Sequence, residues 1–243
     1  MVEALLKGKL SREQENMEDI LTSITFGLLK YIPVNEGLLQ LLSFAYDIND
    51  NKLPNSLHEC TNAKYEFWPL IQDYHNSCEP DVLIEVSSIK DKYLILIEAK
   101  YNSEKTSLKE KNEFVGDQLA KEYMNLLSTT KKKNAQPLLI YLTKDVFIPK
   151  NEIETSISEL KNKAQIDNIQ LFWLSWRHIT LIKSSNKMIL DLISLFRERL
   201  NLFFFEGFRL DEINQKFGWN YIQNFDWAIN FSEVIPYKFC RYE

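Results

Sequence analysis

Near the start of the chain, apolar residues recur at the spacing of a helix. They would share one helical face: Met17, Ile20, Leu21, Ile24 and Leu28. This pattern predicts an amphipathic helix over about residues 12–31, with Ser11 as its N-cap and acidic residues in its first turns. Pro33 should end that helix, and a second helical stretch is expected over about 35–46.

The clearest strand pattern lies in the middle of the chain, where two apolar runs flank a short polar turn. Residues 81–86 form the first run, 87–91 the turn and 92–100 the second run. Such a pattern predicts a β-hairpin. Because both faces of the second run are apolar until its charged end, it is typical of a central strand covered by helices on both sides.

Helical and extended patterns alternate through the rest of the chain. Helices are expected over about 113–128, 151–165 and 186–200, and strands near 65–68, 138–142 and 169–176. This alternation predicts an α/β fold. The aromatic-rich residues 201–243 are expected to form a C-terminal extension that packs on the domain of residues 1–200 or on a partner.

Composition is consistent with one folded domain and an extension. The chain has 243 residues, 45% of them hydrophobic, with only six Gly and seven Pro, so a substantial core can form. No apolar run approaches the roughly 18 residues that cross a bilayer, and the N-terminus lacks a signal-peptide pattern. Three irregularly spaced cysteines indicate no disulfide framework, so a cytoplasmic protein is expected.

Candidate chemistry lies at the end of the second hairpin strand. Glu98 and Lys100 should project from one face of the strand because side chains alternate, and Ala99 should point the other way. Asp81 begins the antiparallel neighbour, so its carboxylate should lie beside Glu98. The two carboxylates and the Ala99 carbonyl would suit Mg²⁺. Lys100 would then orient or help deprotonate an attacking water.

These residues resemble the signature of the PD-(D/E)XK nuclease superfamily, namely Pro80-Asp81 followed by Glu98-Ala99-Lys100 on the next strand. The resemblance implies a restriction-endonuclease-like fold, with a central mixed β-sheet flanked by helices. It also implies a Mg²⁺ or Mn²⁺ ion bound by Asp81, Glu98, Ala99 and an acid from an early helix. Glu18 is the match for that acid, and Glu15, one turn earlier, is the alternative.

Many members of the superfamily also place a glutamine on the helix that follows. Gln118, within Gly116-Asp117-Gln118-Leu119, matches this position. In the RecB-like branch a tyrosine follows four residues later, whereas here Glu122 occupies that place and Tyr123 comes one residue after it. The glutamine role therefore transfers to Gln118, and the RecB-like assignment does not follow.

The resemblance implies a metal-dependent deoxyribonuclease acting in phage defence, restriction or repair, as a homodimer where both strands are cut. RNA remains an alternative substrate. The net charge of -5 opposes attraction of nucleic acid by the surface as a whole. It therefore motivates the alternative of a non-catalytic or partner-activated nucleic-acid-binding or interaction module with the same fold, acting through a helicase or ATPase. A hydrolase of small phosphodiesters is a third alternative. A local basic patch for phosphate contacts could come from Lys105, Lys109, Lys111 and Lys131 to Lys133.

Ordinary structural explanations exist for the same residues. Glu98 and Lys100 could be a solvated charged strand end, and Glu18 could simply complement a helix dipole. A zinc site using His58, Cys60, His75 and Cys78 is a further alternative, although their spacing matches no familiar finger. The joint placement of Asp81, Glu98 and Lys100 across one hairpin favours the nuclease hypothesis.

Overall fold

A five-stranded sheet forms the centre of the computed structural model, which describes residues 15–72, 77–101 and 115–204. In spatial order its strands are β1 (Asn62–Phe67), β4 (Val82–Ser87), β5 (Lys92–Ala99), β6 (Gln136–Thr143) and β7 (Leu171–Ser175). The pairs β1–β4 and β4–β5 are antiparallel, whereas β5–β6 and β6–β7 are parallel. The sheet is therefore mixed, as predicted. A separate short pair joins β2 (Ile71–Gln72) to β3 (Ser77–Cys78).

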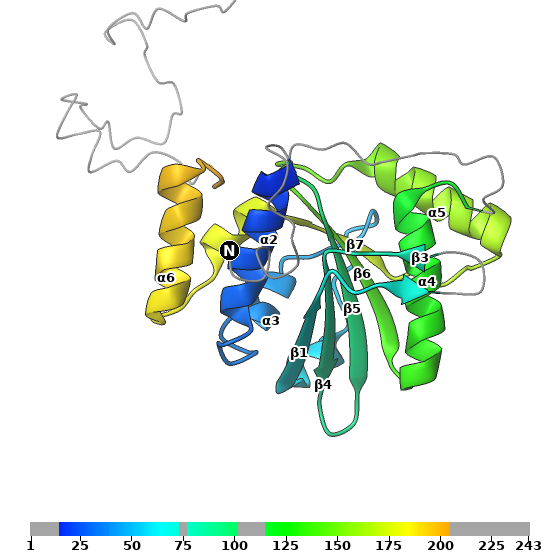
Figure 1. Cartoon of the computed structure of the whole chain (residues 1–243), viewed down its shortest axis with the longest axis horizontal. Helices are drawn as coiled ribbons and strands as arrows, with labels where there is room; N and C mark the ends of the chain where they lie inside the picture. The colour runs from blue at the N-terminus through cyan, green and yellow to red at the C-terminus, as the bar shows by residue number, and fades with distance from the viewer. Residues whose placement is uncertain (1–14, 73–76, 102–114, 205–243) are drawn as a thin grey trace, which may run out of the picture. The chain divides into compact units, whose positions relative to one another are not determined.

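Helices cover both faces of this sheet (Figure 1). On one side lie α2 (Glu15–Leu29), α3 (Leu38–Leu42) and α6 (Lys187–Ser194), and on the other α4 (Gln118–Lys133) and α5 (Lys150–Ala164). Each side has its own apolar core, so the predicted α/β layering is confirmed. Short helical turns complete the fold: η1 (Asn55–Glu59), η2 (Trp176–Leu181) and the π-helical η3 (Leu195–Arg199). No helix in the described part of the chain is long and apolar enough to span a membrane.

The predicted hairpin is formed by β4 and β5, which are joined by a short turn. Val82 pairs with Ile97 and Ser87 with Lys92. Its turn is closed by the Ser88 amide, which donates to the Asp91 carbonyl at 2.8 Å. Because the strands are antiparallel, the residue before β4 lies beside the last residues of β5.

The side chains of β5 alternate between the two cores. Ile95 and Ile97 pack with α2, α3 and α6, whereas Leu94 and Leu96 pack with α4 and α5. All four are fully buried, which confirms the prediction of a central strand. The alternation places Glu98 on the α4 side of the sheet.

The second predicted helix is much shorter than expected. Helical spacing predicted a helix over about 35–46, but α3 covers only Leu38–Leu42. Tyr46 instead forms a β-bridge, in which its amide donates to the Trp173 carbonyl and the Trp173 amide donates back. Pairing with β7, the last strand of the sheet, therefore overrides the local helical pattern.

The prediction for the helix after the hairpin was wrong at both ends. It was expected over about 113–128, whereas α4 begins at Gln118 and ends at Lys133. Asp117 caps the helix, because its carboxylate accepts a hydrogen bond from the Ala120 amide at 3.0 Å. Lysines in the last turn stabilise the helix beyond residue 128, because they offset the negative end of the helix dipole. Asn134, in the left-handed conformation, then ends the helix.

The remaining element boundaries agree more closely with the sequence patterns. The strand expected near 65–68 is longer, since β1 spans Asn62–Phe67, and the helix expected over 186–200 divides into α6 and η3. Ser11 lies outside the described residues, as do residues 205–243 of the predicted extension. The division into 1–200 and 201–243 stays a prediction.

His178 in η2 provides a test of the packing around β7. Its Nδ1 accepts a hydrogen bond from the Ser175 amide at 3.0 Å, and its ring stacks on Phe44. Burial is the main cause that lowers the pKa of His178, to about 4. We expect the His178 ring to remain neutral at pH 5.5 in an NMR titration of the histidine ring protons. Protonation near pH 6.5 would contradict this packing.

Candidate functional site

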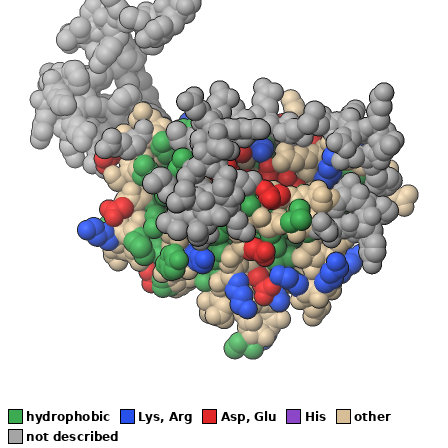
Figure 2. Space-filling view, in the orientation of Figure 1, with side chains coloured by type: hydrophobic (Ala, Val, Ile, Leu, Met, Phe, Trp, Pro, Cys, Tyr) green, Lys and Arg blue, Asp and Glu red, His purple; other side chains and the backbone are tan. Residues whose placement is uncertain are grey.

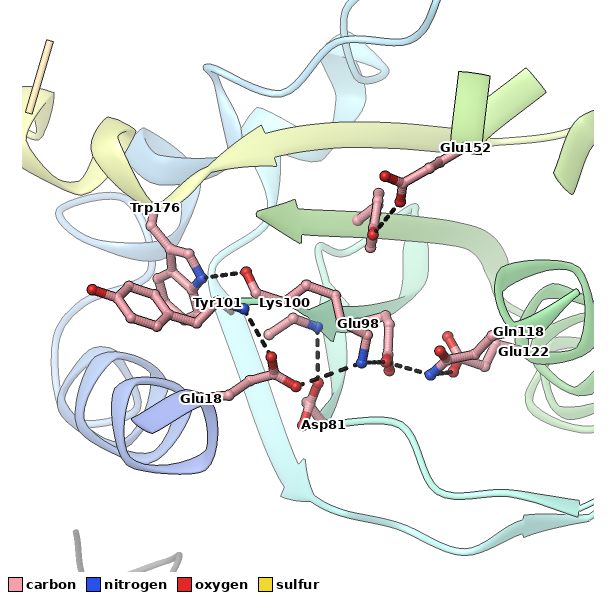
Figure 3. A network of polar contacts seen from close by, with 11 residues as sticks. Glu18, Asp81, Glu98, Lys100, Tyr101, Gln118, Glu122, Glu152 and Trp176 are labelled. Carbon is pink, nitrogen blue, oxygen red and sulfur yellow. Dashed lines mark hydrogen bonds and ion pairs between the residues drawn. The ribbon is translucent and has the colours of Figure 1, made fainter. Parts of the chain in front are cut away.

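Five of the sequence-predicted residues meet at one end of the sheet (Figure 3). Glu98 lies near the end of β5, Lys100 directly follows that strand, and Asp81 directly precedes β4. Glu18 reaches this place from α2, and Gln118 from the first turn of α4. The cluster formed by these five residues is called the carboxylate site below.

Asp81 is fixed against the end of β5. The register Val82–Ile97 places it opposite Glu98, and its Oδ2 accepts a hydrogen bond from the Ala99 amide at 2.8 Å. Its own carbonyl accepts from the Trp68 amide at 3.0 Å. Asp81 is only 8% exposed. The hairpin therefore aligns this carboxylate with Glu98, as the sequence pattern predicted.

Glu98 and Lys100 form a close ion pair. Lys100 Nζ lies 2.6 Å from Glu98 Oε1, which shows that the two side chains project from the same face of the strand end. Glu98 is 3% exposed, so this is not the solvated strand end that charge alone would suggest.

Glu18 joins the same site from the opposite layer. Its Oε1 lies 3.5 Å from Lys100 Nζ, and its Oε2 accepts a hydrogen bond from the Tyr101 amide at 2.8 Å. The adjoining Lys100 carbonyl accepts from Trp176 Nε1 at 3.2 Å. These contacts connect α2 to the segment that follows β5. The side chain of Glu15, the alternative acid, is not among those that the structure describes.

Gln118 brings an additional acid that sequence reasoning missed. Its Nε2 lies 2.5 Å from Glu98 Oε1 and 3.1 Å from Glu122 Oε1. Glu122 lies one turn further along α4 and is 3% exposed. The available signal was the four-residue spacing from Gln118, which places the two side chains on one helical face.

Burial and mutual repulsion disfavour the ionised forms of these acids. Burial raises the pKa of Asp81 well above its ordinary value, and the neighbouring Glu98 charge raises it further. Burial also raises the pKa of Glu98, despite the opposing effect of Lys100. The pKa of Glu122 is raised well above its ordinary value by burial and by Glu98. If all of these acids were ionised, the site would hold more negative charge than Lys100 alone could balance.

Lys100 is held as a cation. Its burial would lower the pKa, but Glu98, Glu18 and Asp81 outweigh burial and raise the pKa above the ordinary lysine value. In this arrangement Lys100 acts as a hydrogen-bond donor and a positive charge. Deprotonation of water by Lys100, one of the two roles expected from the sequence, is disfavoured in this state.

The donor atoms of the carboxylate site fit a hard divalent cation. Carboxylate oxygens suit Mg²⁺ and Mn²⁺, and such an ion would favour the ionised forms of these buried acids by offsetting their charge. Among the described residues, no group of three His, Cys, Asp or Glu side chains stands in a metal-holding arrangement. The role predicted for the Ala99 carbonyl stays a prediction.

The two described cysteines of the alternative zinc site lie on different sides of the sheet. Cys60 is buried in the core beneath α2 and α3, whereas Cys78 packs against the core beneath α4. They cannot share one ion in this fold. His75 lies outside the described residues.

A shallow groove is lined by the two residues that precede α4 and by residues of α5. Its volume is about 660 Å³, and Gly116, Asp117, Glu159 and Lys163 are among its lining residues. The Glu159 carboxylate accepts hydrogen bonds from the Gly116 and Asp117 amides at 3.2 and 2.7 Å. This groove contains none of the five residues of the carboxylate site.

The cap of α4 gives a modest testable effect. Asp117→Ala removes the acceptor for the Ala120 amide immediately before Gln118. We expect the free energy of unfolding to fall by about 1 kcal/mol. Urea denaturation would measure the change, with Asp117→Asn, which retains an acceptor oxygen, as the matched control. Equal losses in the two variants would contradict the capping role.

No family model, curated protein or solved structure matches this chain. The function of the carboxylate site therefore has to be inferred from its own residues.

Proposed function

We propose that this protein is a Mg²⁺- or Mn²⁺-dependent nuclease of the PD-(D/E)XK type, with a restriction-endonuclease-like fold, that hydrolyses phosphodiester bonds of DNA. One observation carries the proposal: Glu98 contacts both Lys100 and Gln118, next to Asp81 on the adjacent strand. These are the residue types, and the strand and helix positions, that the superfamily resemblance requires.

Each residue has a chemical role in this proposal. Asp81, Glu98 and Glu18 would bind the divalent cation together with the Ala99 carbonyl, and the bound cation would lower the pKa of a water and offset charge on the phosphate. Lys100, held as a cation, would orient the attacking water and stabilise negative charge developing on the phosphate oxygens. Gln118 would keep the Glu98 carboxylate oriented through its amide.

Substrate contacts must come from local features rather than from the overall charge. Figure 2 shows acidic and basic side chains interspersed over the described surface in view. Lys131 to Lys133, one candidate basic patch, occupy the last turn of α4, whereas Gln118 occupies its first. A helix of this length separates its ends by about 20 Å. The other candidates, Lys105, Lys109 and Lys111, lie outside the described residues.

A cleavage survey tests this function. Purified protein would be incubated with linear, circular and single-stranded DNA and with RNA, each with Mg²⁺, Mn²⁺ or a chelator. We expect metal-dependent cleavage of DNA by the wild type and none by the double variant Glu98→Ala, Lys100→Ala. Metal binding without cleavage of any substrate would instead support the non-catalytic or partner-activated module. Cleavage of RNA alone would reassign the substrate.

A further inference from the structure

Glu122 is a buried acid that the proposed reaction does not use. It lies on α4 with 3% of its surface exposed, and its Oε1 accepts a hydrogen bond from Gln118 Nε2 at 3.1 Å. The same Nε2 donates to Glu98 Oε1. Within the described residues, Oε2 of Glu122 has no hydrogen-bond partner.

A carboxyl group at this position is costly unless it has a specific task. Leu119, Tyr123 and Leu126 on the same helix are fully buried in the apolar core under α4. An apolar side chain at position 122 would avoid both the desolvation of a carboxyl group and its repulsion by Glu98. An apolar side chain would lose the hydrogen bond from Gln118 and the side-chain hydrogen bond with Glu98.

The geometry favours one orientation of the Gln118 amide. Its nitrogen faces two carboxyl oxygens, one from Glu98 and one from Glu122. Rotating the amide by half a turn would put its carbonyl oxygen against both acceptors. Glu122 thus disfavours the rotated state and keeps the donor directed at Glu98.

Glu98 in turn is held from two sides at a single oxygen. Lys100 Nζ and Gln118 Nε2 both contact Oε1, at 2.6 and 2.5 Å. If the Gln118 amide were free to rotate, only Lys100 of these two side chains would still orient the Glu98 carboxylate. A carboxylate that binds a cation must hold one orientation. Residues that hydrogen-bond to metal ligands commonly fix that orientation.

We infer that Glu122 is a positioning residue of the carboxylate site, which acts through the Gln118 amide to orient Glu98 toward a divalent cation. The role of the cation in this inference rests on the proposed function, whereas the contact between Glu122 and Gln118 does not depend on that function.

Two substitutions of similar size test the inference. Glu122→Gln keeps an oxygen that accepts from Gln118, and Glu122→Met keeps the volume but removes the acceptor. Glu154→Gln, at an exposed position of α5, is the matched control. For each protein, Mn²⁺ affinity would be measured by electron paramagnetic resonance. The side-chain amide signals of Gln118 would be recorded by NMR without metal and assigned through their loss in Gln118→Glu.

Glu122→Met is expected to weaken Mn²⁺ binding by about 10- to 100-fold and to shift the Gln118 amide signals. Glu122→Gln and Glu154→Gln should bind Mn²⁺ like the wild type. The inference is overturned if Glu122→Met changes neither measurement, or if Glu122→Gln loses as much affinity as Glu122→Met. If the wild type binds no Mn²⁺, the proposed function fails. The NMR measurement still tests the contact between Glu122 and Gln118 in that case, because an unshifted Gln118 signal in Glu122→Met would contradict it.

Discussion

Lys100→Met is expected to lower the free energy of unfolding by about 3 kcal/mol at pH 8 in the absence of divalent cations. The Lys100 ammonium contacts Glu98 at 2.6 Å and Glu18 at 3.5 Å, and it is the positive charge that favours ionisation of Asp81. Methionine fills a similar volume but leaves buried acids without this counter-charge. Urea denaturation measured by circular dichroism would give the difference.

The loss from Lys100→Met should depend on pH. Folding raises the pKa of both Asp81 and Glu98, so their protonated forms favour the folded state. Protonated Asp81 and Glu98 contribute stability in full when the pH is below the pKa values that these residues have in the unfolded chain. This contribution is lost as the pH rises through their higher pKa values in the folded protein. The deficit should therefore shrink at pH 5, and combining Lys100→Met with Glu98→Gln should recover part of it at pH 8. An unchanged stability at both pH values would contradict a buried ion pair.

Asp81→Asn is expected to reduce metal-dependent cleavage by roughly 10³-fold, equivalent to about 4 kcal/mol of transition-state stabilisation, without reducing stability. The asparagine oxygen can still accept the hydrogen bond from the Ala99 amide, whereas the ligand charge is lost. Because burial and Glu98 disfavour the Asp81 carboxylate, its removal should raise the free energy of unfolding by about 1 kcal/mol at pH 8.

Cleavage rates and urea denaturation of the same preparations would separate the two effects of Asp81→Asn. Glu154→Gln serves again as the control, because this exposed acid lies on α5 outside the carboxylate site. Wild-type cleavage by Asp81→Asn would remove Asp81 from the proposed cation ligands. A large loss of stability would show instead that the carboxylate is mainly structural.

The sequence was sufficient to predict the hairpin and the contacts across it. Alternation along a strand places Glu98 and Lys100 on one face, and antiparallel pairing places Asp81 beside Glu98. Both rules act over a few residues and depend little on the rest of the fold. The two-sided apolar pattern of 92–100 likewise identified a central strand.

Other features depended on tertiary packing and were not predictable in this way. The early end of α3 follows from the bridge between Tyr46 and Trp173, which are far apart in sequence. Glu122 was noted only as a departure from a family pattern, because its burial beside Glu98 depends on how α4 docks on the sheet. The contact of Glu18 with Tyr101 requires the docking of α2 in the same way.

Removing divalent cations and then adding Mn²⁺ back is the most direct test of the proposed nuclease activity. Wild-type protein and Glu98→Gln would be assayed on DNA after removal of divalent cations, and again after Mn²⁺ is added back. We expect no cleavage by the chelated wild type, restored cleavage after Mn²⁺ addition, and no restoration for Glu98→Gln. Cleavage that persists in the chelator, or that Glu98→Gln performs at the wild-type rate, would contradict a metal-dependent reaction at this site.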